Sequence, residues 1–496
     1  MPQIEALIDQ DDPWLELLRR GAPHPDGRCV LLWVQRAKRA TDNRAANVAI
    51  ALADRLRLPV VAAFIIAPGY PAATFRAYHF MAEGLRELPA AFRGRGIGWV
   101  LRVGEPEVLL PRIVTEFAAA AVVTDLDPLR PGREWRAAIA KRVTVPFVTV
   151  ASDTIAPPAL FPKEEFAART LRPKLWRAIA ANGYLAPLPN PHPQVRDALS
   201  RLNDGPDPVA ALTTMSLDQS VPPSSVIRGS RAQALRRLSQ FLDERLALYP
   251  DHRDRPDRSS QSELSPYLHF GQIGPLEVAR AAIERRVGER AWVSPKGHAV
   301  IGDGDPVEDL PLATFLDELI TQRELAVNFC LRNPAYDRWD GLPDWGRDTL
   351  DKHRDDRRPV LYSPSRIEAG ETGDRLWNAA QRQMLVQGWM PNRLRMYWAK
   401  QILLWTAEPE EAFALAMRLN DRYFLDGRDA NGYAGVAWSI GGRHDRPFPP
   451  NKPILGLVRP MTAKGMARKF DTEAYIAQIA GQIGSTMPSQ VPLALD

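Results

Sequence analysis

Cysteine is scarce in this sequence: the 496 residues include only Cys29 and Cys330, which lie far apart and beside no histidine cluster. Neither a disulfide framework nor a zinc or other metal site is therefore indicated. Such cysteine usage is typical of a reducing compartment, so we expect a cytoplasmic protein.

Long apolar runs are missing as well. No run approaches the ~18 residues of a membrane-spanning helix. The first residues, MPQIEALIDQDDPWLELLRRG, lack the basic-then-apolar order of a signal peptide. We therefore expect neither membrane insertion nor secretion.

Charge of one sign is only slightly in excess, with a formal net charge of +5 and a pI near 9.2. Spread over the whole chain, this excess indicates a polyanionic partner only weakly. The length, with 45% hydrophobic and 25% charged residues, is typical of a globular protein of two or three domains.

The region 25–155 alternates short β-rich runs with helical periodicity. The expected strands are Cys29–Val34, Pro59–Ile66, Gly98–Val103, Ala121–Leu126 and Pro146–Val150. The expected helices are Asn43–Arg57, Ala73–Phe92, Pro106–Ala119 and Gly132–Arg142. This alternation predicts a doubly wound α/β domain with a parallel sheet. A nicotinamide dehydrogenase is disfavoured, because the glycines of Gly94–Trp99 have the wrong spacing for a dinucleotide fingerprint and precede a strand.

The pattern changes after this region. Pro-, Ser- and Asp-rich sequence between Leu185 and Gly229 indicates a surface connection, so we assign 156–229 to an interdomain linker. From Ser230 the periodicity is helical only, and 230–482 is expected to form an all-helical domain without strands. The last residues, 483–496, are expected to be disordered.

Tryptophan is concentrated in one segment of the helical half. Trp377, Trp389, Trp398 and Trp405 all fall within thirty residues. Such a cluster is most often core packing, because a buried indole contributes a large apolar area. A file of indoles could also carry electrons between a buried redox cofactor and the surface. The spacing alone does not distinguish the two interpretations.

Three polar stretches of the helical half are unusual for a core. Gln261–Pro275 offers hydroxyl and backbone donors ahead of a helix, which suit a phosphate group, although a plain capped loop has the same pattern. Phe315–Phe329 carries charged residues on successive helical turns, the usual pattern of an exposed face. Leu419–Phe448 combines acids, amides and glycines in a loop, and such loops are commonly functional.

Basic and aromatic residues are interleaved around the last of these stretches. This combination is typical of a nucleic-acid groove, in which cations hold phosphates and rings stack on bases. The residues are Arg393, Arg395, Arg428, Arg443, Arg446, Lys452 and Arg459, with Trp389, Tyr433, Trp438 and Phe448 among them.

Several motifs together resemble one family, the photolyase/cryptochrome flavoproteins, and within it the class II cyclobutane pyrimidine dimer photolyases. The motifs are WVQRAKRATDNRA, LSPYLHFGQ, RELAVNFC, LWNAAQ, RMYWAKQILLW and LNDRYFLDGRDANGYAG. The resemblance extends from about Leu31 to about Phe470. It implies a light-driven DNA-repair lyase, in which excited reduced FAD in the helical domain gives an electron to the dimer. It also implies a monomer that binds damaged DNA at the nucleoid, and an α/β domain that in many members holds an antenna, a deazaflavin or a folate.

The resemblance also implies roles for individual residues. Trp398, Trp377 and Trp405 would relay electrons to the flavin, with Trp398 nearest to it, whereas Trp389 would serve packing. Asn420, or otherwise Asn431, would face the flavin N5. The other expected cofactor contacts are Tyr249, Ser262, Leu264, Ser265, Arg323, Arg395, Asp426 and Asp429. The expected dimer and DNA contacts are Glu318, Gln322, Asn392, Arg393, Met396, Trp438, Arg446 and Arg459.

Two positions depart from the family pattern. Gln322 stands where class II members carry a Trp that stacks on the dimer, and Pro391 stands where class I members carry a His. Losing one base–aromatic stack would weaken binding by roughly 1–3 kcal/mol, and Pro391 removes a backbone donor. Two alternatives therefore stay open: a cryptochrome-like light sensor without repair, and a flavin- or nucleotide-binding protein whose indoles are only core.

Overall fold

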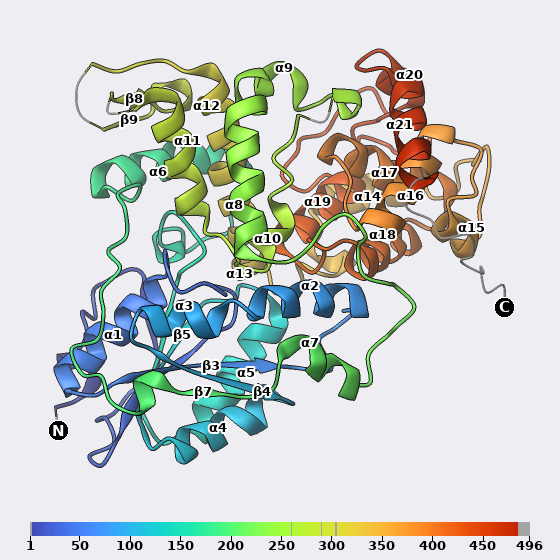
Figure 1. Cartoon of the computed structure of the whole chain (residues 1–496). Helices are drawn as coiled ribbons and strands as arrows, with labels where there is room; N and C mark the ends of the chain where they lie inside the picture. The colour runs from blue at the N-terminus through green and yellow to red at the C-terminus, as the bar shows by residue number, and fades with distance from the viewer. Residues whose placement is uncertain (1, 259, 289, 303–304, 485–496) are drawn as a thin grey trace.

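The structure is a computed structural model that describes residues 2–258, 260–288, 290–302 and 305–484. An α/β half lies below a larger helical half, and a long connection runs along the outside between them (Figure 1). The expected disordered tail, 483–496, lies outside the described residues from 485 onward.

The α/β half contains one seven-stranded sheet. Its order is β1-β6-β5-β2-β3-β4-β7, and all neighbours are parallel except β1 and β6. The strands are β1 (Leu15–Arg19), β2 (Cys29–Trp33), β3 (Val60–Ile66), β4 (Gly98–Val103), β5 (Ala119–Asp125), β6 (Phe147–Val150) and β7 (Asn203–Asp204). The five expected strands are confirmed. The two edge strands were not foreseen, because β1 is largely half-exposed and β7 has only two residues.

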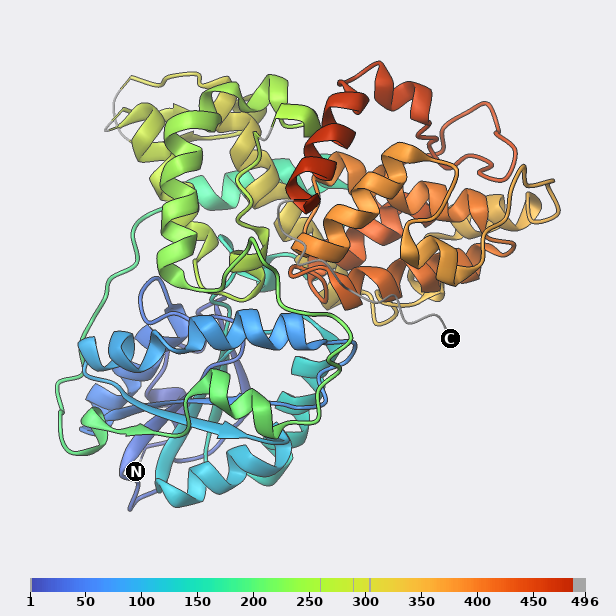
Figure 2. The same cartoon turned by 45° about the vertical axis from the view of Figure 1, so that its right-hand side comes forward.

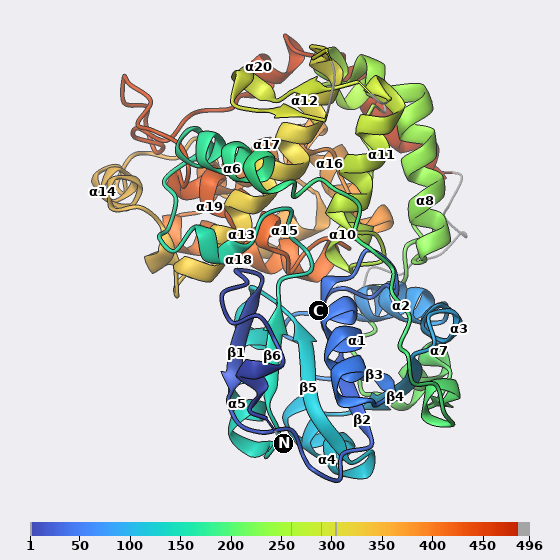
Figure 3. The same ribbon diagram turned by 90° about the vertical axis from the view of Figure 1, so that its left-hand side faces the viewer.

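Helices cover both faces of this sheet (Figure 3). On β2, Val30 and Leu32 join the core under α1 and α2, whereas Leu31 and Trp33 join the core under α4 and α5. This alternation confirms the doubly wound arrangement. The helices are α1 (Arg44–Leu56), α2 (Phe75–Leu85), α3 (Leu88–Gly94), α4 (Pro106–Glu116) and α5 (Arg130–Arg142). The single helix expected over Ala73–Phe92 is two helices, because Pro89 begins a new one.

The helical half consists of two lobes, each with its own core, seen side by side in Figure 2. The first lobe contains α6 (Ala168–Asn182), α8 (Arg231–Gln240), α9 (Tyr249–His252), α10 (Ser265–His269), α11 (Pro275–Val287) and α12 (Leu310–Leu316). A π-helical segment, Asp317–Gln322, leads from α12 into α13 (Arg323–Arg332). The second lobe contains α14 (Asp344–Lys352), α15 (Pro364–Ala369), α16 (Arg375–Gln387), α17 (Asn392–Trp405), α18 (Pro409–Tyr423), α19 (Ala430–Gly441), α20 (Ala463–Ala467) and α21 (Thr472–Gly484).

Two features of the helical half differ from the expectation. The prediction that no strands follow Ser230 was wrong, because β8 (Trp292–Val293) and β9 (Val300–Ile301) form an antiparallel pair. Each strand has two residues, too few to show a strand periodicity in the sequence. In the region 156–229, α6 packs into the first lobe, where Trp176 lies 5.4 Å from the Trp292 ring, and α7 (Pro208–Ala211) packs against α2. No helix in the described ranges is long and apolar enough to cross a membrane.

Candidate functional site

Three of the four clustered tryptophans form a contiguous chain. Trp398 and Trp405 come from α17, and Trp377 of α16 lies between them. The Trp377 and Trp398 rings are parallel with centroids 6.4 Å apart, and the Trp377 and Trp405 centroids are 5.2 Å apart at 73°. We call these three residues the tryptophan chain. Consecutive rings are therefore in contact.

Hydrogen bonds fix the tryptophan chain inside the second lobe. The Trp398 indole donates to Gln381 Oε1 at 2.7 Å, and the Trp377 indole donates to the Trp398 carbonyl at 3.0 Å. All three rings are buried, with Trp405 the most exposed at 7%. The tryptophan chain thus belongs to the core, and its three oxidisable rings are held in fixed positions.

An ion pair between the half-buried Arg395 and the buried Asp426 lies beyond Trp398. The Phe424 ring is 6.3 Å from Trp398, and the Arg395 guanidinium stands 3.9 Å above Phe424. Arg395 also donates to both Asp426 oxygens at 2.9 Å. These charge-assisted hydrogen bonds hold the pair in one arrangement, so this end of the tryptophan chain has a fixed charge distribution.

Asn420 is held at the end of α18, close to the loop that carries Asp426. Its side chain is 3% exposed and donates to Asp421 Oδ1 at 2.8 Å. A Cβ on Gly432 would come within 2.8 Å of the Asn420 amide nitrogen, so a larger residue there would displace the Asn420 side chain. Asn431, the other expected residue, is exposed at the start of α19.

A pocket of about 310 Å³ lies beside the serine-rich loop ahead of α10. Trp389 forms part of its wall and donates to Ser265 Oγ at 3.2 Å. The expected contacts Ser262 and Leu264 are neighbours of the lining rather than part of it, and Leu264 is buried in the first lobe. The lining includes Ser260, Gln261, Glu263, Gln383, Gln387, Trp389, Pro391 and Tyr475.

Glu318 lies in the π-helical segment and binds two partners. The Tyr249 hydroxyl donates to Glu318 Oε2 at 2.6 Å, and Arg253 pairs with the other oxygen. Burial raises the pKa of Glu318, while the hydrogen bond from Tyr249 and the Arg253 charge oppose that rise. Tyr249, an expected cofactor contact, is therefore placed as a partner of Glu318. Gln322, one turn later, is exposed.

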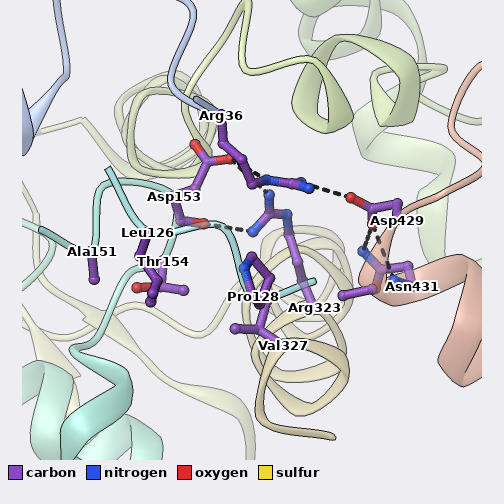
Figure 4. Close-up of a pocket in the computed structure, with 11 residues that line it drawn as sticks. Arg36, Leu126, Pro128, Ala151, Asp153, Thr154, Arg323, Val327, Asp429 and Asn431 are labelled. Carbon is purple, nitrogen blue, oxygen red and sulfur yellow. Dashed lines mark hydrogen bonds and ion pairs between the residues drawn. The ribbon is translucent and has the colours of Figure 1, made fainter. Parts of the chain in front are cut away.

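Arg323, Asp429 and Asn431 have contacts that differ from the expected cofactor contacts. Arg323 donates to the Asp153 carbonyl at 2.6 Å, and Asp429 pairs with Arg36 at 2.7 Å. Asn431 donates to Asp429 at 3.0 Å. Figure 4 shows Arg36 between Asp153 and Asp429, with Arg323 pointing toward Asp153. These residues lie at the boundary between the two halves. Buried charges require partners, and Arg36 and Asp153 of the α/β half are the partners of Asp429 and Arg323.

We call Arg36, Arg39, Asp153, Arg323 and Asp429 the interface cluster. All five side chains are buried, and Arg39 pairs with Asp153 at 2.8 Å. Burial alone would raise the pKa of Asp429, but Arg36 and the His269 hydrogen bond hold it well below its ordinary value. The cluster therefore joins the halves by paired charges.

The expected DNA contacts fall into two groups. Near α17, Asn392 is exposed, Met396 is half-buried and Arg393 pairs with Asp254. On α19, Trp438 is half-buried, and in the loop that follows α19, Arg446 is exposed.

In the loop after α19, Arg459 contacts both an acid, Asp445, and an aromatic ring, Phe448. Arg459 donates to both Asp445 oxygens at 2.9 and 3.0 Å and lies 4.9 Å from the centre of the Phe448 ring. Sequence reasoning missed Lys400, which lies under Trp438. A lysine in the otherwise apolar middle of α17 is the signal that could have found it.

A second pocket, of about 110 Å³, lies at the carboxyl ends of β2 and β3. Aromatic rings form part of its walls, with Trp33, Phe64 and Trp135 among them, and the cations Arg36, Lys38 and Arg428 also line it. Ligands of open parallel sheets bind at the carboxyl ends of the strands. In the described residues, no group of three or more His, Cys, Asp or Glu could hold a metal ion.

Comparisons with known proteins agree with this architecture. The DNA photolyase family model matches residues 30–193. A deoxyribodipyrimidine photo-lyase of Methanothermobacter thermautotrophicus is 37% identical, with 92% of this chain and 96% of the relative covered. One of Potorous tridactylus is 36% identical over 90% of this chain and 80% of the relative. An archaeal photolyase structure from Sulfolobus tokodaii, solved with two FAD molecules, has a TM-score of 0.64 at 18% identity and covers 94% of this chain and 96% of its own. The chain therefore belongs to the DNA photolyase family.

Proposed function

We propose that this protein splits cyclobutane pyrimidine dimers in DNA when it absorbs light, as a class II photolyase with FAD as its redox cofactor. The observation that carries the proposal is the tryptophan chain, which leads through the Phe424 ring to the Arg395–Asp426 ion pair. Packing explains the burial of three indoles, but a packed core does not require them in one file beside a fixed ion pair. The similar proteins named deoxyribodipyrimidine photo-lyase support the same activity.

The residues around the pocket ahead of α10 fit FAD. Hydroxyl, amide and aromatic groups line it, and these are the groups that bind a nucleotide. Trp389 and Pro391 are wall residues, and the carbonyl of Met390 between them accepts a hydrogen bond from Arg395 at 3.1 Å. The pocket wall is thus hydrogen-bonded to the ion pair, which the Phe424 ring connects to Trp398.

Particular residues would hold the cofactor. Ser262, Leu264 and Ser265 would bind the diphosphate, Arg395 and Asp426 would lie beside the flavin ring, and Asn420 would face N5. When bound, reduced FAD supplies an electron to the dimer on excitation by light. Arg323, Asp429 and Asn431 are not included, because their contacts in the structure are at the interface cluster.

The dimer would be flipped out of the duplex, at a cost of a few kcal/mol that is smallest for a damaged, poorly stacked base. Glu318 would hydrogen-bond the dimer and place a proton beside it, because burial raises its pKa and favours the protonated form. Tyr249 and Arg253 orient the carboxyl group. Met396 would contact the dimer and Trp438 would stack on one face of it.

Substitution Glu318→Gln should lower light-driven repair about tenfold to a hundredfold, because the amide keeps the shape of the carboxyl but cannot share its proton. The measurement is dimer loss from DNA under illumination with chemically reduced protein, against a dark sample. Asp317→Asn, one residue earlier and paired with Arg172 instead, is the matched control. Equal rates for Glu318→Gln and the wild type would remove Glu318 from the reaction.

The illumination assay also tests the function itself. Loss of dimers in the light and none in the dark is the expected result. Gln322 is the observation that favours the second candidate, a light sensor, because an exposed amide replaces a stacking ring. Light-driven reduction of the flavin without dimer loss would support the sensor and contradict repair.

The pocket at the carboxyl ends of β2 and β3 would hold the antenna. Its aromatic walls suit a planar ring, and Lys38 and Arg428 suit an anionic group of a deazaflavin or a folate. Arg428 Nη1 is buried without a hydrogen-bond partner in the described part of the chain. Such a donor is expected where a bound ligand supplies the acceptor. The chromophore, freed from natively purified protein, identifies the antenna by its absorption spectrum, and FAD as the sole chromophore would contradict this assignment.

A further inference from the structure

Lys400 is a buried cation without a carboxylate partner. It comes from the middle of α17 and is 1% exposed. Its ammonium group donates to the Ser439 carbonyl at 2.6 Å, and it forms no ion pair in the part of the chain that the structure describes. An unpaired buried charge is costly, so its position requires an explanation beyond packing.

The contact that Lys400 makes is with an aromatic face. Its Nζ lies 4.7 Å from the centre of the Trp438 ring. The ammonium thus touches both the ring and the carbonyl of the next residue, and it fixes the orientation of Trp438 on α19. A cation over the face of a Trp is attracted by the ring, most strongly where water is excluded.

The charged surroundings leave the ammonium weakly compensated. Burial lowers the pKa of Lys400 to about 7; Asp445 opposes this shift and Arg459 adds to it. Both groups come from the loop after α19, and they are paired with each other. No charged group of α16, α18 or α19 acts on Lys400 in the described ranges. Lys400 is therefore charged below about pH 7 and loses its proton above it.

We propose that Lys400 is a positioning residue for lesion binding, which holds Trp438 from behind and places a positive charge behind the face that takes the dimer. This inference rests on the proposed function, in which Trp438 stacks on the dimer. Because Gln322 supplies no second stacking ring, binding depends more heavily on Trp438. A charge behind that ring also favours the negative charge that the dimer gains during repair.

The pH dependence follows from the sign of the shift. With Lys400 protonated, below about pH 7, the cation–aromatic contact is present and dimer binding is strongest. As the pH rises through 7 the contact is lost, and the preference for dimer-containing over undamaged DNA should fall about tenfold. The preference is measured in the dark, so it does not depend on flavin photochemistry.

Two substitutions separate positioning from a merely structural role. Lys400→Met removes the charge and keeps the shape, so it should weaken the preference about tenfold at pH 6 and abolish its pH dependence. It should not lower the melting temperature, since an apolar side chain replaces an unpaired buried charge. Lys400→Arg stays charged at all these pH values, so it should keep the preference and lose the pH dependence.

The experiment measures dissociation constants for a dimer-containing duplex and its undamaged twin between pH 6 and 8.5, for the wild type and both variants. A wild type without preference for the dimer would overturn the proposed function and this inference with it. A wild type that prefers the dimer, with Lys400→Met showing the same preference and pH profile, would overturn only the role of Lys400. If Lys400→Met does not fold, a pH profile of Lys400→Arg that equals the wild-type profile would likewise overturn the role of Lys400.

Discussion

Substitution Trp398→Phe is expected to stop light-driven reduction of the bound flavin while leaving repair by chemically reduced protein intact. Trp398 is the only member of the tryptophan chain in ring contact with Phe424, on which Arg395 stands. Phenylalanine is much harder to oxidise and fills most of the same space. The tryptophan chain therefore loses the oxidisable ring at its Phe424 end. Steady illumination of oxidised protein with an external reductant, followed by absorption of the flavin, measures the effect.

The control for this substitution is Trp339→Phe, a tryptophan of the same lobe that contacts Phe413 and lies outside the chain. It should reduce at the wild-type rate. If Trp398→Phe also reduces at that rate, electrons reach the flavin by another route and the file of indoles is only core. If repair by chemically reduced Trp398→Phe also fails, the substitution has damaged the site itself.

Substitution Arg36→Ala should have the largest effect on stability. It leaves Asp429 buried without the guanidinium that now lies 2.7 Å away. Removing one partner of a buried ion pair costs about 3–5 kcal/mol, because the remaining charge is uncompensated. Chemical unfolding followed by circular dichroism measures the change in the free energy of unfolding.

Arg86→Ala is the matched control, since Arg86 and Asp207 also form a 2.8 Å pair but are about half exposed. Its loss should cost less than about 1 kcal/mol. Equal losses in the two variants would show that the interface cluster does not hold the two halves together. A first transition in which one half unfolds alone would locate the effect at their boundary.

The sequence predicts the α/β half well, because its strands are continuous apolar runs. Val60–Ile66 is buried at every position, so its pattern has no other simple interpretation. The edges of the sheet could not be predicted in the same way. A two-residue strand such as Asn203–Asp204 is defined by its neighbour β4 and not by its own residues.

Site residues are predictable where their partners lie close in sequence. Trp377 and Trp398 are 21 positions apart on adjacent helices. The family motifs LWNAAQ and RMYWAKQILLW, which contain them, predict that the two residues act together. Asp429 is different, because its partner Arg36 is 393 positions away in the other half. A buried acid looks the same in a sequence whether a cofactor or another domain neutralises it. Lys400 was missed for a related reason, since a lysine in a helix usually extends to solvent.

The most direct test is the action spectrum of repair. The rate of dimer loss from DNA is measured at a series of wavelengths with purified protein, and the spectrum is compared with the absorption of its bound chromophores. We expect the rate to follow the absorption of reduced flavin, with added sensitivity where the antenna absorbs. Dimer loss in the dark, or none at any wavelength that the flavin absorbs, would contradict light-driven repair.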